Sequence, residues 1–208
     1  MLVIGITGGT GAGKTTVLEE LERMGAFTID CDALYHELLK GSADMLSEIE
    51  KEFPGTVKDG LVDRKALGKL VFSDAQALKR LNAITHKYVA QEVENRLLNA
   101  ERAGKTLAGI DAIALIESGL GAKCDVIIGV IAPEEQRISR LMKREGITRE
   151  YALLRIRAQK ENDFFERNCD HILNNSYATV QQFRLQCREL LSSIIGKERD
   201  KARKKNAD

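Results

Sequence analysis

The amino-acid sequence predicts an α/β fold, with a five-stranded, mostly parallel sheet and helices on both faces. Two observations support this prediction. Apolar segments of strand length are separated by segments whose apolar residues have helical spacing. A glycine-rich loop at residues 8–15 lies between the first apolar segment and the first helical one, and this order is typical of a parallel sheet that binds a ligand.

Strands and helices are expected to alternate along most of the chain. The expected strands are residues 2–6, 26–29, 107–116, 124–131 and 170–173. The expected helices are residues 14–24, 33–40, 43–53 and 133–145, followed by one that Thr148 caps and one at the C-terminus. Gly25 and Gly146 are the expected helix ends.

Residues 63–102 show helical spacing only, in three apolar stripes that begin at Leu67, Leu78 and Val89. Two turn signals, Pro54-Gly55 and Asp59-Gly60, precede them. Insertions of this kind in a strand–helix protein commonly bind substrate, so we expect a helical binding subdomain here.

The composition is typical of a soluble globular protein, with 43% hydrophobic and 30% charged residues. The net charge of +1 gives no overall attraction to nucleic acid. The four cysteines are widely spaced and form no C-x-x-C pair, so we expect free thiols and no zinc. Because no apolar run approaches the ~18 residues of a membrane span and no secretion signal is present, we expect a cytoplasmic protein that binds no membrane.

The loop at residues 8–15, GGTGAGKT, matches the phosphate-binding pattern GxxxxGK[ST]. Its glycines let backbone N–H groups approach phosphate oxygens, and the following helix N-terminus adds positive potential. We expect Lys14 to reach the β- and γ-phosphates of a nucleoside triphosphate, and the Thr15 hydroxyl to bind Mg²⁺. The residues expected to bind the nucleotide are Gly8, Gly9, Thr10, Gly11, Ala12, Gly13, Lys14, Thr15 and Thr16.

Two aspartates, Asp30 and Asp32, follow the second expected strand. In an extended segment their side chains would face the same side. A hydroxyl that accepts a phosphoryl group needs a carboxylate to orient it and take its proton, and we expect Asp32 in this role. Asp30 is expected to support the metal or to cap the next helix, and capping by both aspartates is the alternative.

Asp111 lies within an apolar strand and Glu117 at its expected end. A buried acid needs a partner, so Asp111 is either a structural hydrogen-bonding residue or a residue near the metal. Ligands of open parallel sheets bind at the carboxyl ends of the strands, so we expect the loop, Asp32 and Glu117 to meet in one crevice.

Arg137, Arg140 and Arg144 are spaced by three and four residues and should share one helix face. Three further arginines follow Gly146: Arg149, Arg155 and Arg157. We expect the two helices to form a hinged lid whose arginines neutralise a transferred phosphoryl group and exclude water, with Arg140 and Arg144 as the catalytic pair. A solvated basic face is the alternative.

Several motifs, taken in order, resemble the dephospho-CoA kinase family over nearly the whole chain. Residues 6–15 are similar to the family's T-G-G-x-G-[SA]-G-K-[ST], IDCD at residues 29–32 to I-D-x-D, and LNAITH at residues 81–86 to L-x-x-I-x-H. VDR at residues 62–64, PEEQRISR at residues 133–140, Arg144 and Gln159 continue the pattern.

This resemblance implies a P-loop kinase that transfers the γ-phosphoryl group of ATP to the 3′-hydroxyl of the ribose of dephospho-CoA, with Mg²⁺ as cofactor. It implies that Asp32 is the base and that Lys14, Arg140 and Arg144 belong to the ATP site. The acceptor is expected to lie near Asp32, Arg64, His86 and Glu117. Thr85 before His86 suggests a helix start.

The chain departs from the family pattern at three positions. Lys87 replaces the proline after the motif histidine, Ile113 replaces the proline of P-L-L-[FV]-E, and Ser176 replaces the glycine of N-x-G. The first two positions bear on contacts with the acceptor, and the third bears on contacts with adenine.

We therefore expect a single P-loop kinase domain with four parts. The nucleotide-binding core comprises residues 1–40, 105–135 and 170–196, the acceptor subdomain residues 41–104, the lid residues 136–165 and a basic tail residues 197–208. The expected partners are ATP and dephospho-CoA, with no nucleic acid or membrane, in a monomer or weak homo-oligomer. A kinase for another small metabolite, or a non-catalytic paralogue that binds CoA or nucleotide, is the alternative.

Overall fold

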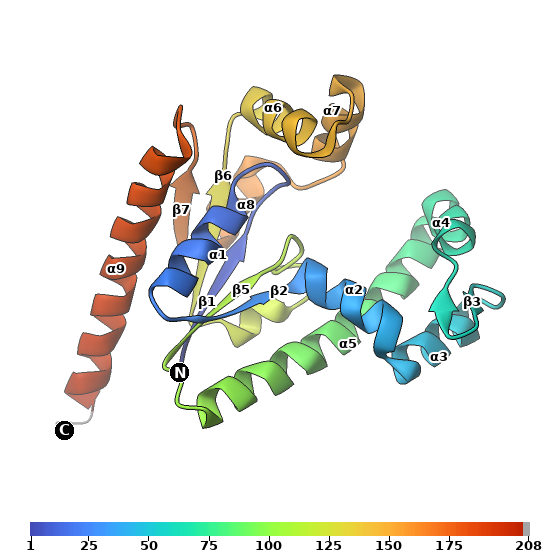
Figure 1. Cartoon of the computed structure of the whole chain (residues 1–208), viewed down its shortest axis with the longest axis horizontal. Helices are drawn as coiled ribbons and strands as arrows, with labels where there is room; N and C mark the ends of the chain where they lie inside the picture. Colours follow the sequence, from blue (N-terminus) through green and yellow to red (C-terminus); the bar gives the residue numbers. More distant parts are fainter. Residues whose placement is uncertain (206–208) are drawn as a thin grey trace. The chain divides into compact units, whose positions relative to one another are not determined.

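The computed structural model describes residues 1–205, except for the side chains of Phe72 and of residues 202–205. The chain divides into two compact units (Figure 1). Unit 1 comprises Met1–Ile29 and Ala103–Asp208, and unit 2 comprises Asp30–Arg102. None of the described helices combines the length and the apolar character needed to cross a membrane.

Unit 1 is built on a sheet with strand order β2-β5-β1-β6-β7. The strands are β1 (Leu2–Thr7), β2 (Phe27–Asp30), β5 (Leu107–Asp111), β6 (Val126–Ile131) and β7 (His171–Asn174). The pairs β1–β5, β1–β6 and β6–β7 are parallel. The predicted α/β class and the five-stranded sheet are therefore confirmed in the described part of the chain.

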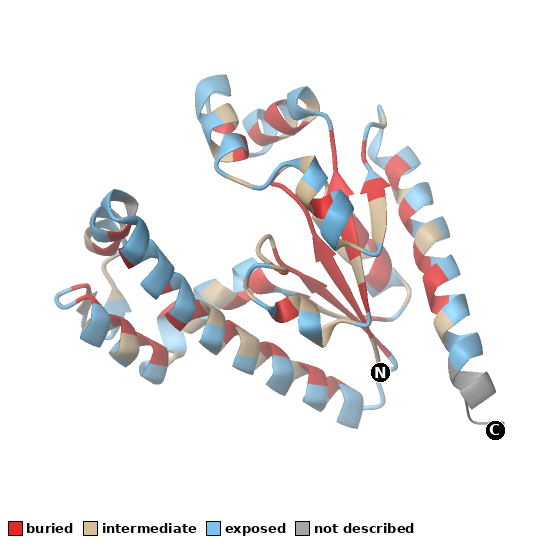
Figure 2. Ribbon diagram, turned by 180° about the vertical axis from the view of Figure 1, so that it is seen from behind, coloured by how far each residue is buried: buried red, intermediate tan, exposed pale blue. Residues whose placement is uncertain are grey.

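Helices cover both faces of this sheet. α1 (Lys14–Arg23) packs against α9 (Val180–Lys205), and with the strands they bury a core that includes Ile4, Leu21 and Phe183. Each such side chain contributes about 1.5–3 kcal/mol of stability. On the opposite face α8 (Asn162–Asn168) packs against β6 and β7, where Gly129 leaves room for Cys169. Figure 2 shows the buried strands and the exposed outer side of α9.

Two helices after β6 form a hairpin. α6 (Glu134–Glu145) and α7 (Arg149–Arg157) pack through Ile138, Leu141, Ala152 and Ile156. The Thr148 hydroxyl accepts a hydrogen bond from the N–H of Tyr151 at 3.3 Å, which confirms the predicted cap. The helix–loop–helix expected for the lid is therefore present.

Unit 2 is helical and has its own core. It contains α2 (Cys31–Gly41), α3 (Ala43–Glu52), α4 (Arg64–Ser73), α5 (Ala75–Arg102) and a small hairpin of β3 (Val57–Lys58) and β4 (Leu61–Val62). α2 packs on α3 and α5, with Leu39 buried beside Met45. Residues 31–40 therefore belong to this unit, although the expected boundary at residue 40 assigned them to the core.

Two local predictions are wrong, and two short elements were not predicted. β5 ends at Asp111, because residues 113–118 turn and bury Leu115 instead of continuing the strand to residue 116. His86 lies inside α5, and Thr85 is buried rather than a cap. Neither α8 nor the β3–β4 hairpin was predicted, because each is too short to show a periodic spacing of apolar residues.

The four cysteines are free thiols. Burial raises the pKa of Cys124 and Cys187 to about 12 and that of Cys169 to about 11, from an ordinary value of 9.0. Thiolate is the reactive form, so these three thiols should be poor nucleophiles at neutral pH.

At pH 8 we expect these three thiols to react with a disulfide reagent at least about a hundredfold more slowly in the native protein than in the urea-unfolded chain. Their contribution to stability should be complete below the unfolded pKa of 9.0 and should be lost as the pH rises toward 12. Labelling rates measured with and without urea test the expected difference in thiol reactivity. Rapid native labelling of more than one thiol would contradict it.

Candidate active site

The phosphate loop joins β1 to α1, and its glycines are required by the backbone. Gly8 has φ of 141°, and a Cβ there would lie 2.2 Å from the carbonyl oxygen of Val130. Gly13, which precedes α1, has φ of 115°, and its Cβ would lie 2.4 Å from Nδ2 of Asn175. Neither position accepts a larger residue. The strand, loop and helix expected around the motif are all present.

The N-terminus of α1 is open toward a ligand. No side chain caps it, and no acidic residue lies in its first turn. Lys14 is half-buried and Thr15 is exposed at the start of the helix. The positive end of the helix dipole makes this terminus suitable for phosphate.

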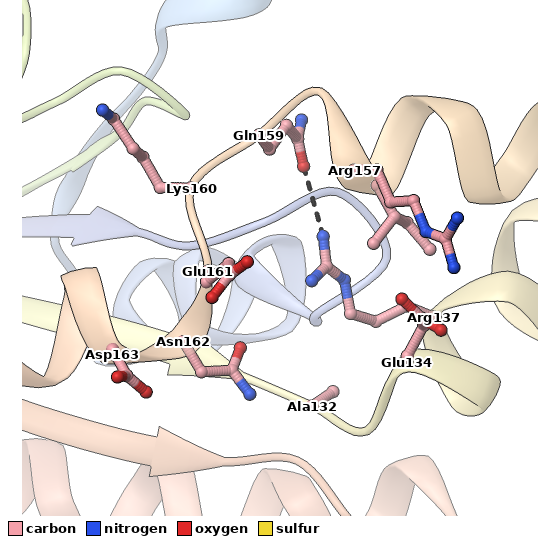
Figure 3. Close-up of a pocket in the computed structure, with 10 residues that line it drawn as sticks. Ala132, Glu134, Arg137, Arg157, Gln159, Lys160, Glu161, Asn162 and Asp163 are labelled. Atoms are coloured by element: carbon pink, nitrogen blue, oxygen red, sulfur yellow. Dashed lines mark hydrogen bonds between the residues drawn. The ribbon is translucent and has the colours of Figure 1, made fainter.

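Arg137 holds the loop from α6. Its Nε donates to the carbonyl oxygen of Thr10 at 2.9 Å, and its Nη2 donates to Oε1 of Gln159 at 3.2 Å (Figure 3). The same Gln159 oxygen accepts a hydrogen bond from the N–H of Thr10 at 2.7 Å. Arg137 is only 5% exposed, and this burial lowers the pKa of its guanidinium.

Arg140 holds the next part of the loop, together with Asn175. Its Nη1 donates to the carbonyl oxygens of Gly11 and Ala12, at 3.2 and 3.3 Å. Its Nη2 donates to Oδ1 of Asn175 at 3.1 Å, while Nδ2 of Asn175 donates to the carbonyl of Ala12 at 2.8 Å. Burial lowers the pKa of Arg140 as well. Arg140 therefore lies against the phosphate loop.

Arg144 does not lie with them. Its side chain is 59% exposed, and its Nη2 donates to Oε1 of the adjacent Glu145 at 2.5 Å. Arg144 was expected to share a helix face with Arg137 and Arg140, but among the described residues it makes none of their hydrogen bonds to the loop carbonyls. Two further arginines of the hairpin are also paired: Arg149 bonds Glu135, and Arg155 bonds Glu145.

The roles of Arg137 and Asn175 at the loop were not predicted from the sequence. A signal for Arg137 exists, because it precedes Leu141 by four residues and therefore shares the buried face of α6. Nothing comparable marks Asn175, which depends on the approach of the segment after β7 to Ala12.

Asp30 and Asp32 differ from the extended arrangement that was predicted. α2 begins at Cys31, and Oδ1 of Asp30 accepts hydrogen bonds from the N–H groups of Asp32 and Ala33, at 2.9 and 3.0 Å. Asp30 is therefore the helix cap, one of its two expected roles. Asp32 lies exposed in the first turn of α2.

Arg64 and His86, also predicted to contact the acceptor, lie in unit 2 with Asp32. His36 is one helical turn after Asp32 on α2, and its Nδ1 lies 3.2 Å from Nη2 of Arg64. His86 is half-buried within α5. Lys87, one of the departures, bonds Glu48 at 2.5 Å, and this hydrogen bond lowers the pKa of Glu48. Lys87 therefore links α5 to α3.

The strand-end acid is Asp111 rather than Glu117. Asp111 is the last residue of β5, opposite Ile6, and it is buried. Glu117 is exposed in the following turn, so its predicted position at the strand end is wrong. No group of three potential metal-ligating His, Cys, Asp or Glu residues occurs among residues 1–205.

The other two departures lie next to the loop. The carbonyl of Ile113 accepts a hydrogen bond from the Thr7 hydroxyl at 3.1 Å. The carbonyl of Ser176 accepts one from Nε2 of Gln136 at 3.2 Å. Both residues contribute backbone atoms to these contacts, which a different side chain can preserve.

A phosphate loop after the first strand of a parallel sheet, with arginine-bearing helices against it, defines a P-loop kinase of the small-molecule type. Shikimate kinase from Acinetobacter baumannii shares the fold, with a TM-score of 0.56 at 17% identity over 95% of this chain and 94% of that chain.

The comparisons identify the family more closely. Residues 2–181 match the family model described as dephospho-CoA kinase. The dephospho-CoA kinase of Corynebacterium jeikeium is 35% identical over 88% of this chain and 94% of its own length. A Campylobacter jejuni dephospho-CoA kinase structure has a TM-score of 0.66 at 25% identity, covering 92% of this chain and 96% of that chain. The chain belongs to the dephospho-CoA kinase family.

A Thermus thermophilus protein, TT1252, is similar over a comparable length. Its structure gives a TM-score of 0.73 at 33% identity, covering 94% of this chain and 97% of that chain. The likeness therefore extends through both units rather than through the phosphate loop alone.

Replacing Asn175 with aspartate tests the contact behind the loop. Asn175→Asp would set a carboxylate oxygen against the Ala12 carbonyl, so we expect a loss of about 1–3 kcal/mol in the free energy of unfolding and weaker ATP binding. Urea unfolding and calorimetric titration measure both. The control is Asn168→Asp, since Asn168 makes the same kind of bond to the Phe164 carbonyl on an exposed helix. Equal effects of the two variants would contradict the expectation.

Proposed function

We propose that this protein transfers the γ-phosphoryl group of ATP to the 3′-hydroxyl of the ribose of dephospho-CoA, which yields CoA and ADP. The proposal depends on one observation above all. An intact phosphate loop at an uncapped helix N-terminus occurs in a chain that matches the dephospho-CoA kinase model over residues 2–181.

ATP is the donor in this proposal, and residues 8–16 bind it. The loop N–H groups and the α1 terminus hold the β-phosphate, while Lys14 reaches the β- and γ-phosphates. Arg140 supports the same loop through the carbonyls of Gly11 and Ala12, and so acts on ATP through the backbone.

Mg²⁺ is the proposed cofactor, and the residues present fit it. The hydroxyl of Thr15 and the carboxylate of Asp111 are hard oxygen donors of the kind that Mg²⁺ prefers, directly or through water. The bound ion would neutralise charge on the β- and γ-phosphate oxygens. Asp111 ends the strand beside β1, which favours this role over a purely structural one.

Asp32 is the proposed general base. Its carboxylate is exposed in the first turn of α2, so it is accessible to a substrate hydroxyl. Arg64 and His86 are proposed to contact the acceptor, together with Glu117 from the turn after β5. Arg64 supplies a positive charge suited to the phosphates of dephospho-CoA.

The α6–α7 hairpin is the proposed lid. Arg144 is exchangeable between Glu145 and a phosphate, because its pairing is exposed and therefore weak. We propose that it turns toward the transferred phosphoryl group when ATP is bound. The proposed setting is the cytoplasm, with ATP and dephospho-CoA as small-molecule partners and a monomer or weak homo-oligomer as the assembly.

An acceptor screen tests the proposed reaction. ADP release is measured by a coupled assay with dephospho-CoA, AMP, shikimate, gluconate or uridine as acceptor. We expect turnover with dephospho-CoA in large excess over the others. Turnover with another acceptor instead would favour a different metabolite kinase. Binding of dephospho-CoA without turnover would identify a non-catalytic paralogue.

Asp32→Asn tests the base. We expect kcat with dephospho-CoA to fall by about a hundredfold or more, because the amide cannot take the hydroxyl proton. Steady-state kinetics measures it. Asp44→Asn is the matched control, since Asp44 is also an exposed aspartate in the first turn of a unit 2 helix. An unchanged kcat in Asp32→Asn would remove the proposed role.

Metal removal tests the cofactor. We expect EDTA to abolish turnover and added Mg²⁺ to restore it, and Thr15→Val to raise the Mg²⁺ concentration for half-maximal activity by about tenfold. Rates measured across a Mg²⁺ titration provide the comparison. Full turnover in EDTA would contradict the metal requirement.

A further inference from the structure

We propose that Arg137 is a positioning residue of the phosphate loop, whose buried charge orients the Thr10 backbone and strengthens binding of phosphate-bearing nucleotides over the nucleoside. The inference rests on the proposed ATP site. Arg137 is distinct from Arg140 and Arg144, the arginines expected to act on ATP. Its contacts, its charge environment and its position against Gly9 support the proposal.

The contacts of Arg137 hold both the backbone carbonyl and the backbone N–H of Thr10. Its Nε donates to the carbonyl of Thr10 at 2.9 Å. The N–H of Thr10 donates to Gln159, and Arg137 fixes that same Gln159 oxygen through Nη2. Arg137 therefore restrains the donor and the acceptor of Thr10 together, directly on one side and through Gln159 on the other.

The guanidinium also packs directly against the loop backbone. A Cβ at Gly9 would lie 2.2 Å from Nη2 of Arg137, and one at Gly11 would lie 2.9 Å from the Arg137 carbonyl oxygen. A cation this close to the loop contributes to the potential that an anion in the loop experiences. Burial strengthens that contribution, because solvent screens it less.

The pattern of charge pairing distinguishes Arg137 from its neighbours. Three other arginines of the hairpin bond to glutamates: Arg144, Arg149 and Arg155. Within the described residues, the hydrogen bonds of Arg137 and Arg140 end on neutral oxygens. Glu134 attracts Arg137 without forming an ion pair. The positive charge beneath the loop therefore has no hydrogen-bonded carboxylate partner among the described residues, and Glu134 offsets it only in part.

A buried cation without a carboxylate partner is unfavourable, unless a ligand supplies the negative charge. In the proposed function the loop binds ATP, whose phosphates supply this negative charge. The benefit from Arg137 should then grow with the number of phosphates. A residue that merely stabilises the fold would affect adenosine and ADP equally.

The test compares nucleotide affinities in folded variants. Dissociation constants for adenosine, AMP, ADP and ATP are measured by displacement of a fluorescent nucleotide, with circular dichroism as the check of folding. We expect Arg137→Gln to weaken ADP and ATP binding by about tenfold, equivalent to about 1.4 kcal/mol, while adenosine binding changes by less than about twofold. Arg137→Lys, which keeps the charge, should recover part of the loss.

Arg167→Gln is the matched control. Arg167 lies exposed on α8, and its Nε donates to the carbonyl of Asp163 without touching the loop. It removes one positive charge from the same region of the chain, and it should leave the ratio of ADP to adenosine affinity unchanged. An equal change of this ratio in Arg167→Gln and Arg137→Gln would overturn the proposal.

A second variant decides the question if Arg137→Gln does not fold. Glu134 is exposed and attracts Arg137, so it partly offsets the charge beneath the loop. Glu134→Gln should therefore tighten ADP binding by about twofold to threefold and leave adenosine unchanged. Unchanged or weaker ADP binding in this variant would overturn the proposal.

The two proposals fail in different ways. If the wild-type protein binds neither ADP nor ATP, the proposed function and this inference both fail. If the wild type binds ADP and Arg137→Gln binds it as tightly, or loses adenosine and ADP affinity to the same degree, only the inference fails.

Discussion

A loop that turns its N–H groups toward an anion must turn its carbonyl oxygens the other way, and those oxygens need donors. Three consecutive carbonyls of the phosphate loop meet this requirement through side chains distant in the sequence. Arg137 bonds Thr10, Arg140 bonds Gly11 and Ala12, and Asn175 also bonds Ala12. The start of α6 and the end of β7 are therefore part of the loop's structure, although the motif contains neither.

Because of this requirement, the stability of the phosphate loop is coupled to that of the α6–α7 hairpin. Arg137 and Arg140 donate hydrogen bonds to loop carbonyls. Arg149 and Arg155 are instead paired with Glu135 and Glu145. The packing of Ile138 against Ile156 keeps the two helices together. A change at the α6–α7 contact should therefore reach the phosphate loop through hydrogen bonds rather than through loss of stability.

The sequence predicted the fold class, the loop and most helices because each has a local pattern: glycines at fixed positions, a helical period or a cap such as Thr148. It failed where tertiary contacts decide the outcome. The apolar residues after Asp111 fill a turn rather than a strand, and Arg137 is buried in a helix where Arg140 is half-buried and Arg144 is exposed. Asp32 was predicted in an extended segment because the local sequence does not show that Asp30 caps a helix. The structure shows that this helix, α2, already begins at Cys31.

Unit 2 is one uninterrupted segment, Asp30–Arg102, and it connects β2 to β5, two neighbouring strands of the sheet. A connection between two strands can grow or shrink at small entropic cost, because closure depends only weakly on length. The segment Asp30–Arg102, which carries Asp32 and Arg64, can therefore be replaced as one unit by a segment of different length. If Asp32 and Arg64 act on the acceptor as proposed, grafting the corresponding segment from a kinase with another acceptor would redirect specificity and leave the phosphate loop unchanged.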